Sequence, residues 1–431
     1  MNSNRDWTRG NALELLENGE EFFPRVFDDI AEAKREVIIE TFIWYDDEIG
    51  RQLRDALVTA AERGVQVDVT VDGYGSAPLG KAFVASLTEA GVRLHVFAPL
   101  PPILGVQANL FRRLHRKLVV IDQRVAYVGG INYSDEHMRY YGEKSKQDYA
   151  TRVTGPAVDD IHRFCREAIG HPTPQGRRNL RGLLRWLPSK WSHPESDAQV
   201  LLVTRDNHNH RTAIEAMYRL GLRSASRDIV LLNAYFFPGY RFLRAMRQAV
   251  ERGVRVRLVL QGEPDKAYVK FAASTLYDHL LNIGVEIWEF MERPSHAKVA
   301  VMDDAWATVG SSNLDPFSLS LNLEANLFVR DTSFAGELRE KLEALLAERC
   351  VQITRDAVAR RHPIWHVWRW VGYHLLRHFP KLASLIPVKP TMLKTIEDPD
   401  TDLGTGPGPR TLGHSPRPES PAEPDPQNTQ R

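Results

Sequence analysis

Two stretches of the chain repeat the same order of apolar and polar residues. Residues 35–73 open with the apolar, β-prone run Val37–Trp44, and residues 227–262 open with the similar run Ile229–Tyr235. An amphipathic segment with helical periodicity follows in each stretch, and then a second apolar run. We therefore predict a strand, a helix and a strand in both stretches, with parallel strands joined by a right-handed crossover.

A second predicted helix and a second kind of strand follow in each copy. Glycines stand where the helices should end: Gly64, Gly91, Gly253 and Gly284. The short apolar runs Leu118–Ile121 and Val299–Met302 come next, and each has the composition of a buried strand. The chain is thus predicted to hold two similar α/β domains in tandem. The predicted boundaries are 1–170 for the first domain, 171–196 for a linker, 197–350 for the second domain, 351–390 for an amphipathic segment and 391–431 for a disordered tail.

Each predicted buried strand lies inside the pattern His-x-Lys-x4-Asp. The first copy holds His115, Lys117 and Asp122, and the second holds His296, Lys298 and Asp303. Side chains alternate along a strand, so the histidine and lysine of each copy share one face. The aspartates fall out of this alternation, at or past the strand end, and we interpret them as organisers of the site and not as proton shuttles. Each copy therefore offers an imidazole that can act as nucleophile or acid, with an ammonium group beside it.

The sequence after each motif repeats as well. Asn132 and Asn313 follow their histidines at the same distance (132 − 115 = 313 − 296 = 17). Farther on, Asp148 and Glu324 stand where a strand would bring a carboxylate back toward the motif, to hold the tautomer of a neighbouring imidazole. One such match is weak evidence, but a doubled match with the same flanking residues is specific.

The paired motifs resemble the active-site motifs of the phospholipase D superfamily. The flanking sequence is similar to that of bacterial cardiolipin synthases, above all those of type B, over residues 10–350. The resemblance implies two α/β/α sandwich domains related by a pseudo-twofold axis, with the active site at their interface. It also implies transfer of a phosphatidyl group between two phosphatidylglycerol molecules through a phosphohistidine, with release of glycerol. Phosphatidylethanolamine is a second possible donor.

The resemblance also assigns roles to individual residues. It implies that His115 is the nucleophile and that His296 is the acid and base, although the symmetry of the motifs leaves the choice open. The lysines and Asn132 and Asn313 would surround the non-bridging phosphoryl oxygens. Two lysines can replace a divalent ion, so no metal and no cofactor is expected. The alternatives are a hydrolase of phospholipids or, less well supported, of nucleic acid, and a non-catalytic membrane-binding scaffold.

Composition narrows these alternatives. The chain has 431 residues, with 56 Lys and Arg against 55 Asp and Glu, and this near-neutral balance argues against a nucleic-acid partner. Two cysteines, Cys165 and Cys350, favour a reducing compartment. The first residues lack the apolar core of a signal peptide, and no apolar stretch is long enough to span a bilayer. We expect a peripheral protein on the cytoplasmic face of the membrane; its oligomeric state stays open.

Three segments are candidates for contact with a phospholipid surface. The first copy has an apolar insertion within residues 99–113, since Gly91 to His115 is longer than Gly284 to His296 (115 − 91 = 24; 296 − 284 = 12). Residues 177–191 and 355–389 combine arginines with tryptophans and leucines. Basic amphipathic segments of this kind lie in the membrane interface, but packing against the protein is the alternative for all three.

Overall fold

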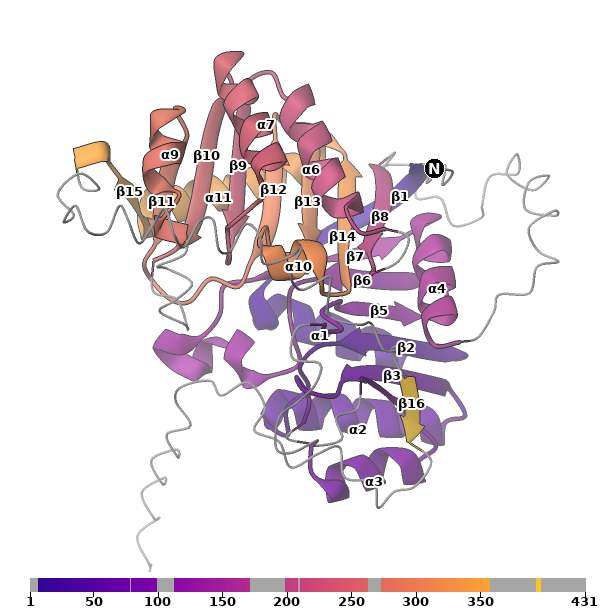
Figure 1. Ribbon diagram of the computed structural model, residues 1–431. Coiled ribbons are helices and arrows are strands. Elements are labelled where there is room, and N and C mark those ends of the chain that lie inside the picture. The colour runs from indigo at the N-terminus through magenta and orange to yellow at the C-terminus, as the bar shows by residue number, and fades with distance from the viewer. Residues whose placement is uncertain are drawn as a thin grey trace, which may run out of the picture.

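The computed structural model describes residues 7–77, 79–98, 112–170, 198–207, 210–262, 273–356 and 393–396 (Figure 1). The first half contains, in chain order, β1 (Thr8–Glu17), α1 (Asn18–Ala31), β2 (Glu36–Thr41), α2 (Glu48–Glu62), β3 (Gln66–Asp72), α3 (Lys81–Glu89), β4 (Arg93–Phe97), β5 (Leu118–Ile121), β6 (Val125–Gly129), the 3₁₀ helices η1 (Asp135–His137) and η2 (Arg139–Lys144), β7 (Tyr149–Thr154) and α4 (Ala157–Ala168).

The second half repeats this order with small changes. It contains β8 (Ala198–Arg205), α6 (Ala213–Ser224), β9 (Asp228–Asn233), α7 (Tyr240–Glu251), β10 (Arg255–Gln261), α9 (Tyr277–Asn282), β11 (Glu286–Phe290), β12 (Lys298–Met302), β13 (Trp306–Gly310), α10 (Pro316–Ser320), β14 (Glu324–Arg330), α11 (Thr332–Arg349) and β15 (Cys350–Ile353). A last strand, β16 (Leu393–Ile396), follows near the end of the chain.

The strands of both halves join into one sheet. Its order is β15-β11-β10-β9-β12-β13-β14-β8-β1-β7-β6-β5-β2-β3-β4-β16. The seven strands from β11 to β8 match, position by position, the seven from β4 to β1, which is the pseudo-twofold relation expected of a duplication. β1 pairs with β7 on one side and with β8 on the other, so the two halves meet edge to edge there. Figure 1 shows the strands of the two halves running in different directions.

The predicted strand–helix–strand units are confirmed. β2 pairs in parallel with β3, and β9 pairs in parallel with β10. Helix α2 begins where the Asp47 carboxylate accepts a hydrogen bond from the Gly50 amide at 2.9 Å, and it buries Leu53 and Leu57 against the sheet. Gly64 follows with φ of 86°, a conformation that glycine adopts without strain, and Gly253 after α7 has φ of 87°. The capping glycines were therefore interpreted correctly.

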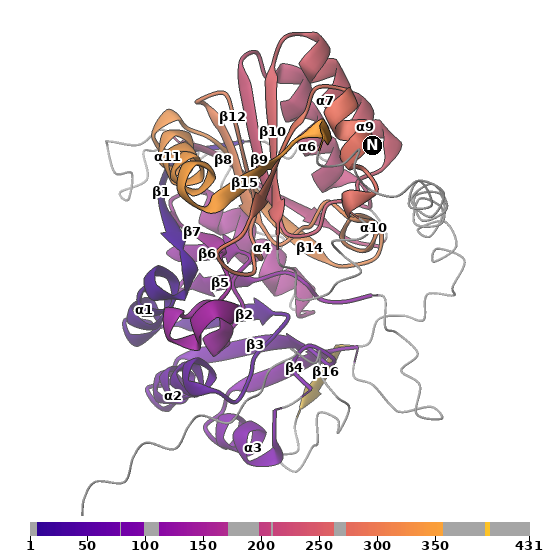
Figure 2. The same ribbon diagram turned by 90° about the vertical axis from the view of Figure 1, so that its left-hand side faces the viewer.

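Most buried apolar residues of the described chain form two separate cores and one shared core. Helices α1–α3 cover one face of the first half, and α6, α7 and α9 cover one face of the second (Figures 1 and 2). The third core combines α4 of the first half and α11 of the second with strands from both, including Val120 and Val301. This arrangement makes each half an α/β/α sandwich and holds the two halves in a fixed relation, which any site between them requires.

Two details differ from the sequence prediction. The tail from residue 391 on was predicted to be disordered, and this is wrong for Leu393–Ile396, which pairs antiparallel with β4 as β16. β15 runs from Cys350 to Ile353, across the predicted end of the second domain, and pairs with β11. Residues 99–111, 171–196 and 357–389, which carry almost all of the predicted membrane-binding sequence, lie outside the described residues. Within the part of the chain that the structure describes, no helix is long and apolar enough to cross a bilayer.

Candidate active site

The two histidine motifs meet at the boundary between the halves. The backbone around each histidine is held by the opposite half: the His115 amide donates to the Leu323 carbonyl at 2.9 Å, and the His296 amide donates to the Gln147 carbonyl at 2.8 Å. The neighbouring residues form isolated bridges of the same kind, Leu114 with Leu323 and Gln147 with Ser295. Both motifs are thereby fixed to one interface, and the imidazole ring centroids lie 6.3 Å apart.

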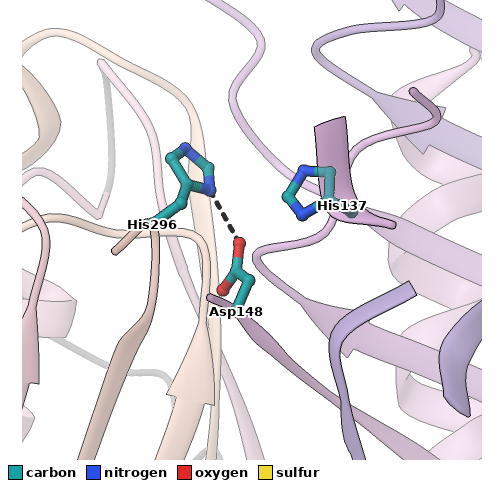
Figure 3. Close-up of side chains that lie close together, drawn as sticks. All are labelled: His137, Asp148 and His296. Atoms are coloured by element: carbon teal, nitrogen blue, oxygen red, sulfur yellow. Dashed lines mark hydrogen bonds and ion pairs between the residues drawn. The ribbon is translucent and has the colours of Figure 1, made fainter. Parts of the chain in front are cut away.

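Each imidazole is bound by a carboxylate from the other half. His115 Nδ1 lies 3.0 Å from Glu324 Oε2, and His296 Nδ1 lies 2.6 Å from Asp148 Oδ2 (Figure 3). Each acid was predicted to return toward the motif and to hold a neighbouring imidazole, and in the structure each acid binds the histidine of the other half. Both carboxylates are fully buried. Because Nδ1 of each ring is committed to an acid, Nε2 is the nitrogen left for chemistry.

Both lysines lie beside their own histidine. Lys117 Nζ donates to the His115 carbonyl at 2.8 Å, and Lys298 Nζ donates to the His296 carbonyl. Lys298 is completely buried and Lys117 is nearly so. Two buried ammonium groups near each other repel, and an anion placed between them would relieve that repulsion. The site is therefore arranged for an anionic group next to the two imidazoles.

The asparagines flank the site with different contacts. Asn132 Oδ1 accepts a hydrogen bond from the Ile43 amide at 3.2 Å, which ties the turn after β6 to the end of β2. Asn313 is buried as well, and its Oδ1 has no hydrogen-bond partner among the described residues. Just before them, Ser311 Oγ donates to Glu324 Oε2 at 2.5 Å, whereas at Gly130 a Cβ would lie 2.3 Å from Asp148 Oδ1. At this position the second copy thus has a hydroxyl that binds its carboxylate, whereas the first copy has no room for a side chain.

Comparisons with known proteins show the family to which this chain belongs. A model of the family described as "Cardiolipin synthase, PLD-like domain" matches residues 26–156 and 220–346. The protein called "Cardiolipin synthase B" in Shigella flexneri is 48% identical over 394 residues, which is 91% of this chain and 94% of that protein. This chain belongs to the cardiolipin synthase family with phospholipase D-like domains. As a member, it is a phosphatidyltransferase that acts on phospholipids.

More distant relatives extend the comparison. The "Major cardiolipin synthase ClsA" of Bacillus subtilis (strain 168) is 33% identical over 376 residues, covering 85% of this chain and 74% of that protein. Among solved structures, the phosphatidylserine synthase of Haemophilus influenzae Rd KW20 superposes with a TM-score of 0.61 at 16% identity, covering 86% of this chain and 93% of that chain. The second likeness supports the fold alone.

Burial sets the protonation states of this synthase-family site. Burial lowers the pKa of His115, against the opposing pull of Glu324, and it lowers the pKa of His296 strongly, with the charge of Lys298 adding to the effect. Burial by itself would raise the pKa of Glu324, but the contact with His115 and the charge of Lys117 hold it below its usual range. Both imidazoles therefore favour the neutral form in the free site, with Nδ1–H donated to an acid, and the Nε2 lone pair of His115 is able to attack phosphorus.

The pKa values of Asp148 and Lys117 are both shifted toward neutral pH. Burial raises the pKa of Asp148 to about 6, although the charge of Lys298 opposes this. Burial also lowers the pKa of Lys117 to about 7, and the charge of Lys298 adds to the decrease. An incoming phosphoryl group would raise the pKa of Lys117 again, because a nearby anion favours the ammonium form.

The motif aspartates lie just past the ends of their strands, as the alternation predicted. Asp122 follows β5, whereas His115 precedes it, so the two lie at opposite ends of the strand. The Asp122 carboxylate accepts hydrogen bonds from the amides of Lys34, Arg35 and Glu36 at 2.8, 2.8 and 3.0 Å. Asp303 binds the amides at 226–228 in the same way. Both aspartates thus organise the start of a neighbouring strand, at the opposite end of the motif strand from the histidine, and their role as organisers of the site stays a prediction.

Sequence reasoning missed a third imidazole. His137 is completely buried in η1, and its ring centroid lies 5.9 Å from that of His296. One nitrogen of each ring lies within 4.8 Å of an Asp148 oxygen, so the three residues form a group of metal-ligand type (Figure 3). Burial strongly lowers the pKa of His137 and of His296, and the charges of Lys298, Lys117 and Lys146 add to the decrease. The same charges would repel a metal ion. The only sequence signal was the position of His137, five residues after Asn132 (137 − 132 = 5), where the second copy has Ser318 (318 − 313 = 5).

Proposed function

We propose that this protein is a cardiolipin synthase that transfers the phosphatidyl group of one phosphatidylglycerol to a terminal hydroxyl of another and releases glycerol. The observation that carries the proposal is the pair of imidazoles, 6.3 Å apart by ring centroid, each held at Nδ1 by a carboxylate of the opposite half. In-line exchange at phosphorus needs a nucleophile on one side and an acid on the other. Two facing half-sites supply both.

When the anionic phosphodiester binds, its charge favours the imidazolium form of His296, which takes up a proton at Nε2. In the first step, His115 Nε2 then attacks phosphorus, the P–O bond to the glycerol head group breaks, and the proton on His296 Nε2 passes to the departing oxygen. The phosphatidyl group is then bonded to His115, whose ring carries a positive charge. Glu324 fits this role because its pKa is held low and it contacts His115 Nδ1 at 3.0 Å, so it stabilises that charge. Lys117 and Lys298 neutralise the phosphoryl oxygens.

In the second step, His296 removes a proton from the hydroxyl of the acceptor lipid, which attacks the phosphohistidine. The new P–O bond replaces the P–N bond, and His115 returns to its neutral form. Phosphatidylethanolamine serves as donor by the same route, with ethanolamine leaving. The chain's own lysines provide the charge stabilisation, so we propose that the reaction needs no metal ion and no cofactor.

We also propose that the protein works as a peripheral protein on the cytoplasmic face of the membrane. Support comes from the apolar and basic composition of residues 99–113, 177–191 and 355–389. Each Lys or Arg near an anionic surface contributes about 1 kcal/mol to binding. Sedimentation with phosphatidylglycerol vesicles should therefore weaken in high salt without vanishing, since apolar burial remains. Equal binding to vesicles of a purely zwitterionic lipid would contradict the electrostatic part of this proposal.

Incubation with phosphatidylglycerol vesicles and mass analysis of the products tests the activity. Intact protein should form cardiolipin and glycerol in equal amounts. H115A and H296A should each abolish the product, and the double variant should be no worse, because the two groups act as one unit. R255Q, which removes an arginine paired with Glu286 at the surface, serves as the control. Phosphatidic acid as the main product of intact protein would establish the alternative, a phospholipid hydrolase.

A further inference from the structure

An enzyme that transfers a phosphatidyl group between two phosphatidylglycerols must bind a second lipid as acceptor, whereas a hydrolase needs only water. The group that leaves is glycerol, which is neutral, whereas the group that enters is the glycerol of a second lipid and carries its own phosphate. If His115 holds the phosphatidyl group, both groups occupy the side of phosphorus that faces His296. A synthase therefore benefits from an anion-binding subsite on the His296 side, one glycerol away from the reacting phosphorus.

His137 offers an uncommitted donor on that side. Its Nε2 accepts a hydrogen bond from the Asn132 amide at 3.2 Å, so the neutral ring carries its proton on Nδ1. Nδ1 is buried and has no hydrogen-bond partner among the described residues. A buried donor without a partner costs about 1–3 kcal/mol, which a ligand could recover. Figure 3 shows His137 and His296 on either side of Asp148, with the two rings facing the same space.

Arg293 adds a cation to this side. It lies three residues before His296 (296 − 293 = 3) and is only 7% exposed. Nη1 donates to Ser145 Oγ at 3.1 Å and Nη2 donates to Gln147 Oε1 at 2.5 Å, so neutral acceptors hold the guanidinium in place. Its Nε is buried and meets no hydrogen-bond partner in the described parts of the chain. A guanidinium oriented by neutral groups keeps its full charge for an anion.

Lys146 is a second buried cation on this side, and it is paired with a carboxylate. Its Nζ lies 2.5 Å from Glu136 Oε2, and both groups are buried. The charges of Lys146 and Arg293 both reach His137, where they lower the imidazole pKa together with burial. The corresponding positions of the second copy, beside His115, are Ser318 for His137 and Asn322 for Lys146 (148 − 146 = 324 − 322 = 2). The duplication therefore placed His137 and Lys146 in one half-site only.

We infer that His137, Arg293 and Lys146 form a subsite for the glycerol phosphate head group of the acceptor lipid. Arg293 and Lys146 bind its phosphate, and His137 donates a hydrogen bond from Nδ1 to a head-group oxygen while His296 takes the proton from the attacking hydroxyl. The subsite favours phosphatidylglycerol over glycerol and water as acceptor. This inference rests on the proposed function, because it describes the second substrate of that reaction.

Competition between two acceptors tests the inference. Phosphatidylglycerol vesicles are incubated with labelled free glycerol, and the ratio of cardiolipin to labelled phosphatidylglycerol is measured. Both products arise from the same phosphohistidine, so the ratio reports on the acceptor alone. R293Q and H137Q should each lower the ratio about tenfold, the effect of one charge-assisted hydrogen bond. In H137Q the amide oxygen can still accept from Asn132, but the donor at the Nδ1 position is lost.

Two further variants serve as matched comparisons. H137N places an amide nitrogen near the Nδ1 position and should keep the ratio closer to that of intact protein than H137Q does. R205Q removes an equally buried arginine on the opposite side, where Arg205 is the cross-strand neighbour of Glu324, and it should leave the ratio unchanged. If R293Q fails to fold, the pair H137Q and H137N decides.

The outcomes separate the subsite from the proposed function. An unchanged ratio in R293Q and H137Q, including a parallel loss of both products, overturns the subsite. A ratio that falls in R205Q but not in R293Q overturns it too and places the acceptor on the His115 side. Intact protein that releases phosphatidic acid without cardiolipin contradicts the proposed function instead.

Discussion

Replacing Glu324 by Gln should slow cardiolipin formation although Glu324 belongs to the half of the chain that does not contain His115. Glu324 is fully buried, and its Oε2 lies 3.0 Å from His115 Nδ1. A hydrogen bond to a charged group contributes about 1.5–3 kcal/mol, and this bond strengthens when phosphorylation makes the His115 ring positive. The expected loss is therefore about tenfold to hundredfold in kcat, since each 1.4 kcal/mol is tenfold.

The assay is the initial rate of cardiolipin formation on phosphatidylglycerol vesicles, with the melting temperature measured in parallel. S311A is the graded comparison, because it removes only the hydroxyl that donates to Glu324 at 2.5 Å and should cost less than E324Q. E286Q, a change in a surface ion pair with Arg255, should leave the rate unchanged. A rate for E324Q within about twofold of intact protein, a free-energy change well below that of one such bond, would refute the crossed pairing as a functional arrangement.

The remaining predictions concern pH, stability and metal ions. The pKa of Lys117 is about 7 in the free site, and a bound phosphoryl group raises it, so KM should rise as pH increases above about 7. In K117R, whose side chain stays charged, this rise in KM should disappear. A rise in KM that persists in K117R would exclude Lys117 as its source. D122A should lower the free energy of unfolding by about 2 kcal/mol or more, because three backbone amides lose their acceptor. The folded variant should keep most of its activity. Loss of activity without any change in the denaturant midpoint would show that Asp122 acts in the active site. Saturating chelator should leave the rate nearly unchanged, and a loss that a divalent ion restores would point to metal binding at His137, Asp148 and His296.

The sequence predicted those parts of the fold that local sequence patterns determine. The apolar runs, the helical periodicity and Gly64 and Gly253 at the helix ends specify each strand–helix–strand unit without reference to the rest of the chain. Because the chain is duplicated, the pattern of the second half supported the elements predicted for the first half. β16 escaped prediction because Leu393–Ile396 gains its order from the exposed edge of β4, which only the folded sheet provides.

The sequence predicted which residues form the candidate site, but it did not predict which carboxylate pairs with which imidazole. His115 and Glu324 are far apart in sequence (324 − 115 = 209), and which carboxylate meets which imidazole depends on how the two halves join at Leu114 and Leu323. The sequence predicted that Asp122 lies at or past the strand end, but it did not show that the carboxylate binds the backbone amides of residues 34–36, because those residues come from a distant part of the chain. His137 was missed because burial, and not a repeated motif, makes it notable.

The central claim is that His115 carries the phosphatidyl group and His296 handles the protons. The most direct measurement uses the H296A variant with phosphatidyl-p-nitrophenol, whose leaving group departs without protonation. The account predicts a burst of nitrophenol equal to the amount of enzyme, and a phosphatidyl group on the peptide that contains His115. A modified peptide found around residue 296 in H115A and none around His115 in H296A would contradict it.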